Sequence, residues 1–275
     1  LKAGIIRAIG KPEERFNEDY LRMLRAVRFA GRFGFRIEPT TALAIRKNAH
    51  KIVQISGERI REELEKILSH ESAADTMRLL DDLGLARRIL PEMFTDPTLW
   101  SEALERLNIV APKRDMVLCF AAILCALPRG QIRRIIRRWG GSNDLRDSLC
   151  WMSEHLQDWQ DASSMSLARL KQLLANKDFD RLWQLWRAEQ LIRTGTQQAC
   201  RVLRRRIRRI PPDKIAPEPL INGEDLKKIG LPQGPAIGEI LRMVYQAQLN
   251  EQINTRRQAL ILARKLSARK HPSPC

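Results

Sequence analysis

The sequence predicts an all-α protein made of several helical bundles. Apolar residues recur at spacings of three and four along nearly the whole chain, whereas Val and Ile never alternate with polar residues for long enough to favour a strand. A length of 275 residues with 44% hydrophobic content is sufficient to bury real cores. The length favours two or three helical modules joined by short linkers, and we expect them in an elongated arrangement.

The first helical pattern begins near Pro12, in the string EERFNEDYLRMLRAVRFAGRFGF. It places Leu21, Leu24 and Val27 on a buried stripe. A neighbouring stripe carries four arginines, which are Arg22, Arg25, Arg28 and Arg32. Asp19 lies one helical turn before Arg22, and the ordinary interpretation of that spacing is a surface ion pair. Taken alone, this pair does not indicate a function.

Two further patterns follow. GERIREELEKIL begins after Ser56, a favourable N-terminal residue, and its apolar stripe consists of Ile60, Leu64, Ile67 and Leu68. SAADTMRLLDDLG has a second apolar stripe and closes at Gly84. A short second turn of helix then reaches Pro91, so SAADTMRLLDDLGLARRILPEM predicts a helix–turn–helix outline over residues 72–93.

The C-terminal region predicts three more helices. Asn222 is placed to cap a short helix that ends at Gly230, and Pro235 begins the next one. The core-facing residues of that second helix are Ile237, Ile240, Leu241 and Val244. Thr255 and Gln258 predict a capping box at the start of the last helix.

The charge of the chain indicates a polyanionic partner. Lys and Arg exceed Asp and Glu by 49 to 32, which gives a formal net charge of +17. Nucleic acid is the leading class of partner, and an anionic membrane is the competing one. No apolar run approaches the ~18 residues of a spanning helix, and no signal-like leader opens the chain, so we expect a soluble, cytoplasmic protein. The five cysteines form no CxxC pair, which predicts reduced thiols in the core.

Two arginine-rich tracts are candidate RNA contacts. RVLRRRIRRI contains Arg201, Arg204, Arg205, Arg206, Arg208 and Arg209. RRIIRR contains Arg133, Arg134, Arg137 and Arg138. Crowded like charges favour a bound polyanion, and each phosphate contact would make RNA affinity salt-dependent. The alternative is an exposed helix face whose cations pair with acidic residues of the same fold.

The string RAIGKPEERFNEDYLRMLRAVRFAGRFGFRIEP, followed by SGERIREELEKIL, resembles the neck of the class II tRNA nucleotidyltransferase and bacterial poly(A) polymerase family. Glu18, Asp19 and Arg22 fall on its EDxxR motif. The resemblance implies that Asp19 and Arg22 pair with the Watson–Crick edge of the incoming cytosine or adenine. A carboxylate accepts from an exocyclic amine and a guanidinium donates to a ring nitrogen or carbonyl. By the same resemblance, Arg25 and Arg28 contact the triphosphate or stabilise the neighbouring wall.

The resemblance also implies a domain organisation. Residues 1–10 would be a remnant of the catalytic head, 11–95 the neck, 96–210 a helical body and 211–275 an RNA-binding tail. In the neck, the helix after the template helix would brace it through charged residues, which are Glu58, Arg59, Arg61 and Glu62. The tail would hold tRNA by shape and phosphate contacts.

In this family the head supplies the Asp residues that hold Mg²⁺, and this sequence contains no such segment. We therefore expect no catalytic residue and no metal site in the chain, and no nucleotidyl transfer without a head domain in cis. The implied function is a part in adding C and A, from CTP and ATP, to tRNA 3′ ends. The chain would supply base selection and tRNA binding.

The alternatives are part of a poly(A) polymerase and a stand-alone helical RNA-binding module. A DNA-binding protein is a third alternative, but the sequence contains no recognition-helix or zinc-finger pattern to support it.

Overall fold

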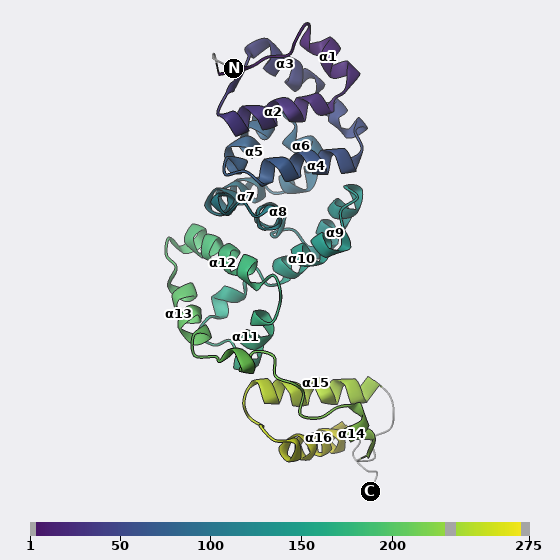
Figure 1. Ribbon diagram of the computed structural model, residues 1–275, viewed down its shortest axis with the longest axis vertical. Helices are drawn as coiled ribbons and strands as arrows, with labels where there is room; N and C mark the ends of the chain where they lie inside the picture. The colour runs from purple at the N-terminus through teal and green to yellow at the C-terminus, as the bar shows by residue number, and fades with distance from the viewer. Residues whose placement is uncertain (1–3, 229–234, 271–275) are drawn as a thin grey trace. The chain divides into compact units, whose positions relative to one another are not determined.

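The computed structural model describes residues 4–228 and 235–270, and α-helices dominate it (Figure 1). The predicted all-α class is confirmed. Two strands of two residues each, β1 (Ile5–Ile6) and β2 (Arg36–Ile37), pair in parallel and were not predicted. Such short strands carry no detectable alternation of apolar and polar residues. The predicted helix end at Gly230, the thiol of Cys275 and residues 1–3 of the predicted head remnant lie outside the described residues.

The chain divides into two compact units. The first consists of Leu1–Trp159 with Asp180–Gln197, and the second consists of Gln160–Phe179 with Gln198–Cys275. The head, neck, body and tail boundaries stay predictions. Among the described residues, no helix is long and apolar enough to cross a membrane.

The first unit begins with six helices, of which α2 packs against α1, α4 and α5. Their bounds are α1 (Pro12–Glu18), α2 (Leu21–Phe33), α3 (Pro39–Asn48), α4 (Gly57–Leu68), α5 (Ala73–Asp82) and α6 (Ala86–Ile89). Helix α2 packs against both α4 and α5 and buries Leu21, Leu24 and Val27, as the apolar stripe predicts. The single helix expected over this region is wrong, because the chain leaves helical conformation at Asp19. The predicted turn at Gly84 is present in left-handed conformation, with φ +75°.

The rest of the first unit is built around the apolar helix α8. Its helices are α7 (Pro97–Val110), α8 (Met116–Leu124), α9 (Arg129–Arg138), α10 (Asn143–Glu154) and most of α12 (Phe179–Thr194). Short 3₁₀ helices in the chain are η1 (Ala49–Gln54), η2 (Pro91–Phe94), η3 (Ala111–Lys113), η4 (Asp158–Asp161) and η5 (Pro212–Lys214).

Buried Arg106 pairs with buried Glu189 at 3.0 Å, so neither charge is left without a partner.

The second unit contains the C-terminal helices and confirms their predicted caps. Its helices are α11 (Leu167–Leu174), α13 (Gln198–Ile207), α14 (Gly223–Lys228), α15 (Pro235–Leu249) and α16 (Arg256–Lys270). Asn222 accepts from the Asp225 amide and Asp225 accepts from the Asn222 amide, each at 3.1 Å. Thr255 and Gln258 form the expected capping box. The core among α14, α15 and α16 includes Ile221, Leu226, Ile240, Val244, Ala259 and Ala263.

The four described cysteines, Cys119, Cys125, Cys150 and Cys200, are buried free thiols, as expected. Burial raises the pKa of Cys119 to about 12 and that of Cys125 to about 11. Burial likewise raises the pKa of Cys150. These three thiols are therefore protonated at neutral pH.

The N-terminus of α4 lies directly against the C-terminus of α9. A Cβ on Gly57 would lie 1.9 Å from the carbonyl oxygen of Arg138, so only glycine permits this approach. Arg61 of α4 donates hydrogen bonds to the carbonyl oxygens of Trp139, at 3.2 Å, and Gly140. The positive end of one helix thus meets the negative end of the other, which stabilises the contact.

We expect Gly57→Ala to lower the free energy of unfolding of the first unit by about 2 kcal/mol or more, since the methyl group would overlap rigid backbone. The matched control is Gly130→Ala in α9, where a Cβ would come no closer than 3.9 Å to a side-chain nitrogen of Arg134. Urea denaturation followed by circular dichroism measures both. Equal stability of the two variants would contradict the close approach.

Candidate nucleotide-binding site

The EDxxR residues lie on both sides of the break between α1 and α2. Glu18 is the last residue of α1, Asp19 has extended backbone, with φ −159° and ψ 106°, and Arg22 lies in the first turn of α2. The Asp19 Oδ1 accepts a hydrogen bond from the Leu21 amide at 3.1 Å. This side chain therefore satisfies one of the amides that a helix N-terminus leaves without an intrahelical partner.

Each charged residue of the motif has its own partner. Glu18 pairs with Arg22 and, at 2.9 Å, with Arg15. The Asp19 Oδ2 pairs with Nη2 of Arg59, from α4, at 2.8 Å. The surface ion pair expected between Asp19 and Arg22 is therefore wrong, because the break turns Asp19 toward α4. The side chains of Asp19 and Arg22 remain 21% and 35% exposed, so both are fixed yet accessible.

Both carboxylates of the motif are ionised at neutral pH. Burial alone would raise the pKa of Asp19, but hydrogen bonds from Arg59 and the Leu21 amide, with the positive charge of Arg59 and Arg25, hold that pKa below its usual value. The hydrogen bond from Arg22 lowers the pKa of Glu18. Asp19 consequently presents hydrogen-bond acceptors alone.

Arg22 keeps donors available for a ligand. Its Nη1 makes both of its side-chain hydrogen bonds, to Glu18 and to the carbonyl oxygen of Arg15 at 2.9 Å. Within the described part of the chain, its Nε and Nη2 make no hydrogen bond. A guanidinium carries five N–H donors, so this arrangement sets an acceptor, Asp19, near a partly unused donor group.

A cavity of about 240 Å³ lies beside the motif, between α2 and the chain that follows β1. Arg15, Arg22 and Arg25 line it together with the aromatic rings of Phe16 and Phe29. Guanidinium groups bind phosphate oxygens and aromatic rings provide apolar contact. Of the five predicted nucleotide-binding residues, the cavity therefore includes Arg22 and Arg25, whereas Glu18, Asp19 and Arg28 lie outside its lining.

A buried carboxylate that the sequence analysis missed, Glu63 of α4, holds α2 in place. It is 2% exposed and pairs with Arg28 at 2.8 Å, Lys66 at 3.0 Å and Arg25 at 3.5 Å. Burial by itself would raise the pKa of Glu63, but Lys66 and Arg28 outweigh it and lower that pKa. Arg28, 13% exposed, therefore fixes α2 against α4, and its predicted part in the nucleotide site stays a prediction. The signal in the sequence was a Glu on the apolar stripe of α4, three residues after Ile60.

Of the four residues of the ERIREEL segment expected to brace the predicted template helix, Arg59 forms an ion pair with the EDxxR segment, at Asp19. Arg61 instead contacts the end of α9 and pairs with Glu65 at 3.1 Å, the pairing its spacing favours. In the described chain, Glu58 and Glu62 form no ion pair with α1 or α2. The bracing contacts are therefore those of Arg59 and Glu63.

The first arginine-rich tract lies in α9 of the first unit, and the second lies in α13 of the second unit and in the turn after it, which contains Arg208 and Arg209. Arg133, Arg134 and Arg137 are exposed, whereas Arg138 pairs with Glu92 at 2.7 Å. In the second tract, the exposed members are Arg201, Arg204, Arg205, Arg208 and Arg209. Across the described residues, none of these exposed arginines pairs with a carboxylate.

Arg206 differs from its neighbours in the tract. It is half-buried and donates to the carbonyl oxygens of Ala162, at 2.7 Å, and Met165. It therefore fixes α13 within the second unit. Its predicted contact with RNA has to be tested apart from this structural role.

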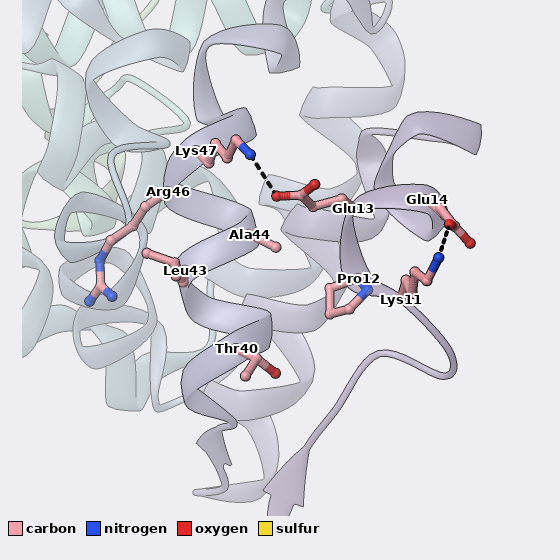
Figure 2. A pocket seen from close by; sticks show the side chains of 9 residues that line it. All are labelled: Lys11, Pro12, Glu13, Glu14, Thr40, Leu43, Ala44, Arg46 and Lys47. Carbon is pink, nitrogen blue, oxygen red and sulfur yellow. Dashed lines mark hydrogen bonds and ion pairs between the residues drawn. The ribbon is translucent and has the colours of Figure 1, made fainter.

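An open groove between α1 and α3 contains none of the predicted site residues (Figure 2). Its side chains pair with one another, Lys47 with Glu13 at 2.8 Å and Lys11 with Glu14 at 3.0 Å. We assign it no function, because four of its five charged side chains pair with one another and the fifth, Arg46, donates to the carbonyl oxygen of Asp82 at 3.3 Å.

Two family models match the chain. Residues 34–96 match "Probable RNA and SrmB- binding site of polymerase A". Residues 113–263, more than half of the chain, match "tRNA nucleotidyltransferase domain 2 putative".

Curated relatives match over nearly the whole chain. It is 30% identical over 280 residues to the CCA-adding enzyme of Geobacillus stearothermophilus and 32% identical over 269 residues to that of Lactiplantibacillus plantarum (strain ATCC BAA-793 / NCIMB 8826 / WCFS1). These matches cover 94% and 95% of this chain. The chain spans 63% of the length of each relative.

Solved structures show the same fold. The crystal structure of Bacillus stearothermophilus CCA-adding enzyme in complex with CTP aligns with a TM-score of 0.74 at 28% identity, covering 99% of this chain and 68% of that one. A Thermotoga maritima CCA-adding enzyme complexed with tRNA aligns with a TM-score of 0.62 at 20% identity, covering 98% of this chain and 65% of that one. The second likeness concerns the fold alone.

We expect Glu63→Gln to lower the free energy of unfolding by about 2 kcal/mol at pH 7, because it removes the charge that three cations surround. The folded-state pKa of Glu63 lies below its unfolded value of about 4.3, so the ionised form stabilises the fold above that value. This contribution disappears as the pH falls through the lower, folded-state pKa. Urea denaturation at pH 7 and pH 3.5 measures the difference.

The matched control is Glu62→Gln, an exposed neighbour on the same helix. Its effect should stay within about 0.5 kcal/mol at both pH values. A pH-independent effect of Glu63→Gln would argue that its shape, and not its charge, holds α2.

Proposed function

Because the chain belongs to the tRNA nucleotidyltransferase family, we propose that it is the part of a CCA-adding enzyme that selects the incoming nucleotide and binds tRNA. One observation carries the proposal. An ionised carboxylate, Asp19, and a guanidinium with available donors, Arg22, lie at one break between helices beside a cavity lined with arginines.

This pair of groups suits C and A better than U and G. Cytosine and adenine each present an exocyclic amine beside a ring-nitrogen acceptor on the Watson–Crick edge. Asp19 would accept from the amine and Arg22 would donate to the ring nitrogen. Uracil and guanine present a carbonyl beside an N–H instead, which would place an acceptor against Asp19. The chemistry of the pair therefore supports CTP and ATP as substrates.

The remaining site residues have supporting roles in this proposal. Arg25 would contact the triphosphate from the wall of the cavity, while Glu18 orients Arg22 and Arg28 holds α2 against Glu63. The arginines of α9 and α13 that have no carboxylate partner would contact phosphates of tRNA. We place this tRNA maturation in the cytoplasm.

The complete enzyme would use Mg²⁺ to stabilise the charge of the transferring phosphoryl group. The residues described here do not fit such a site, since they contain no group of three or more His, Cys, Asp or Glu that could hold a metal ion. No step assigned to this chain depends on the metal.

A poly(A) polymerase is the second candidate, favoured by the description of the family that matches residues 34–96. Fluorescence anisotropy across a salt series distinguishes the two, with tRNA lacking its 3′ CCA and an unstructured RNA of equal length as ligands. Preferential binding of tRNA is the expected result. Equal binding of both RNAs would favour poly(A) polymerase or a stand-alone RNA-binding module.

In a full-length enzyme that contains this chain, we expect Asp19→Asn to reduce the preference for CTP and ATP over UTP and GTP by about tenfold or more, because the amide adds a donor where the carboxylate only accepts. Steady-state kinetics with each nucleotide measures the preference. Glu14→Gln, an exposed change on α1, is the control. Unchanged selectivity with Asp19→Asn would rule out the template role.

We expect the combined change of Arg204, Arg205 and Arg208 to Gln to weaken tRNA binding. The slope of log affinity against log salt concentration should become shallower by up to about 0.9 for each phosphate contact that is lost. Arg206 is left intact because it supports α13. Anisotropy titrations at several salt concentrations give the slope.

The control removes three cations that already pair with carboxylates, which are Arg78, Arg114 and Lys227. The net charge change is the same in both variants. A slope identical to that of the parent in the α13 variant would show that this helix is only a solvated face.

A further inference from the structure

A polar depression of about 570 Å³ lies on the first unit, where α9 turns into α10. Arg133 and Arg137 of α9, the glycines 140 and 141 of the turn, and Arg146 of α10 line it. Since all of these elements belong to one unit, the depression is a feature of a single compact body.

The glycine turn shapes the floor of this depression. Gly140 has φ +58°, and its amide donates to the carbonyl oxygen of Arg137 at 3.0 Å. The Gly141 amide donates to Ile136 at 2.9 Å, and a Cβ on Gly141 would lie 2.7 Å from a methyl carbon of Ile136. The floor therefore has backbone where other residues would place side chains.

The N-terminus of α10 also contributes. This 12-residue helix begins at Asn143, which lines the depression, and the Ser142 side chain accepts from the Leu145 amide at 3.1 Å. The positive end of a helix of this length favours a nearby anion.

The charges around the depression are not balanced. In the described part of the chain, Arg133 and Arg137 pair with no carboxylate, although they stand one helical turn apart on α9. Arg146 is held by Asn143 at 2.7 Å and by Asp147 at 2.9 Å, which offsets its charge and fixes its direction. Glu58 packs against Gly140 but does not line the depression. Two guanidinium charges are thus left to repel each other unless an anion lies between them.

We propose that this depression binds one phosphate group of the RNA backbone, with Arg133 and Arg137 as its ligands. The proposal rests on tRNA binding by this chain, as proposed above, and adds a defined contact point to it. Guanidinium forks match phosphate oxygens. No aromatic side chain lines the depression, so it suits a phosphate and not a stacked base.

The test compares Arg137, inside the depression, with Arg129, which lies on the same helix outside the depression and pairs with Glu154. Binding of tRNA to the full 275-residue chain is measured by anisotropy across a salt series. Arg137→Gln should weaken tRNA binding about tenfold. It should also reduce the steepness of log affinity against log salt concentration by about one. Arg137→Lys should weaken binding about threefold, because an ammonium keeps the charge but loses the fork. Arg129→Lys should leave the affinity unchanged, because Arg129 already pairs with Glu154.

Equal behaviour of the Arg129 and Arg137 variants would overturn the proposal and leave diffuse charge attraction. If the parent chain fails to prefer tRNA over unstructured RNA, the proposed function fails instead, whatever the variants do. Circular dichroism melting checks that each variant is folded.

Competition with pyrophosphate tests whether the depression binds a phosphate of RNA or a free phosphate compound. Competition between pyrophosphate and tRNA that Arg137→Gln abolishes would support the shared site. Pyrophosphate binding that depends on Arg137, combined with tRNA affinity that does not, would show that the depression serves a free phosphate compound and would overturn the RNA assignment.

Discussion

The ion cluster around Glu63 is the interaction on which the proposed nucleotide site depends. A carboxylate that is 2% exposed is costly unless cations compensate it, and Arg25, Arg28 and Lys66 do so. These contacts fix α2 against α4. Because Arg59 of the same α4 pairs with Asp19, the position of the proposed base-selecting residues follows from this one packed interface. The site residues themselves are too exposed to impose that geometry.

Helix α4 also contacts α9, the helix that carries the exposed arginines of the first unit. Its N-terminus meets the end of α9 at Gly57, and Arg61 binds the carbonyl oxygens there. One helix therefore contacts both the proposed nucleotide site and the helix that carries Arg133 and Arg137.

Local rules in the sequence predicted much of this structure. Caps at Asn222 and Thr255 and the start of α15 at Pro235 were predictable because these residues bond to backbone a few positions away or fix its φ angle. The EDxxR resemblance likewise led to the correct family. The break at Asp19 was not predicted, because apolar spacing continues across it and the pairing with Arg59 joins residues 40 positions apart.

Long-range pairing also explains the other differences. Glu63 interrupts an apolar stripe, which marks it as unusual, but its partners on α2 lie 35 and 38 residues away. Arg206 looks like one more cation in a basic tract, and only its contact with carbonyl groups more than 40 positions away separates it from its neighbours. The chemistry of a residue can be inferred from local sequence, but its choice of partner depends on the fold.

The buried thiols give the molecule an internal reporter. Thiol reagents attack the thiolate, and Cys119 and Cys125 hold their protons because they are enclosed in the first unit, while Cys200 lies in the second. Alkylation at these positions would therefore register transient opening of the chain and not its surface chemistry. Peptide-resolved labelling rates would give each unit its own opening rate, without a dye or an added mutation.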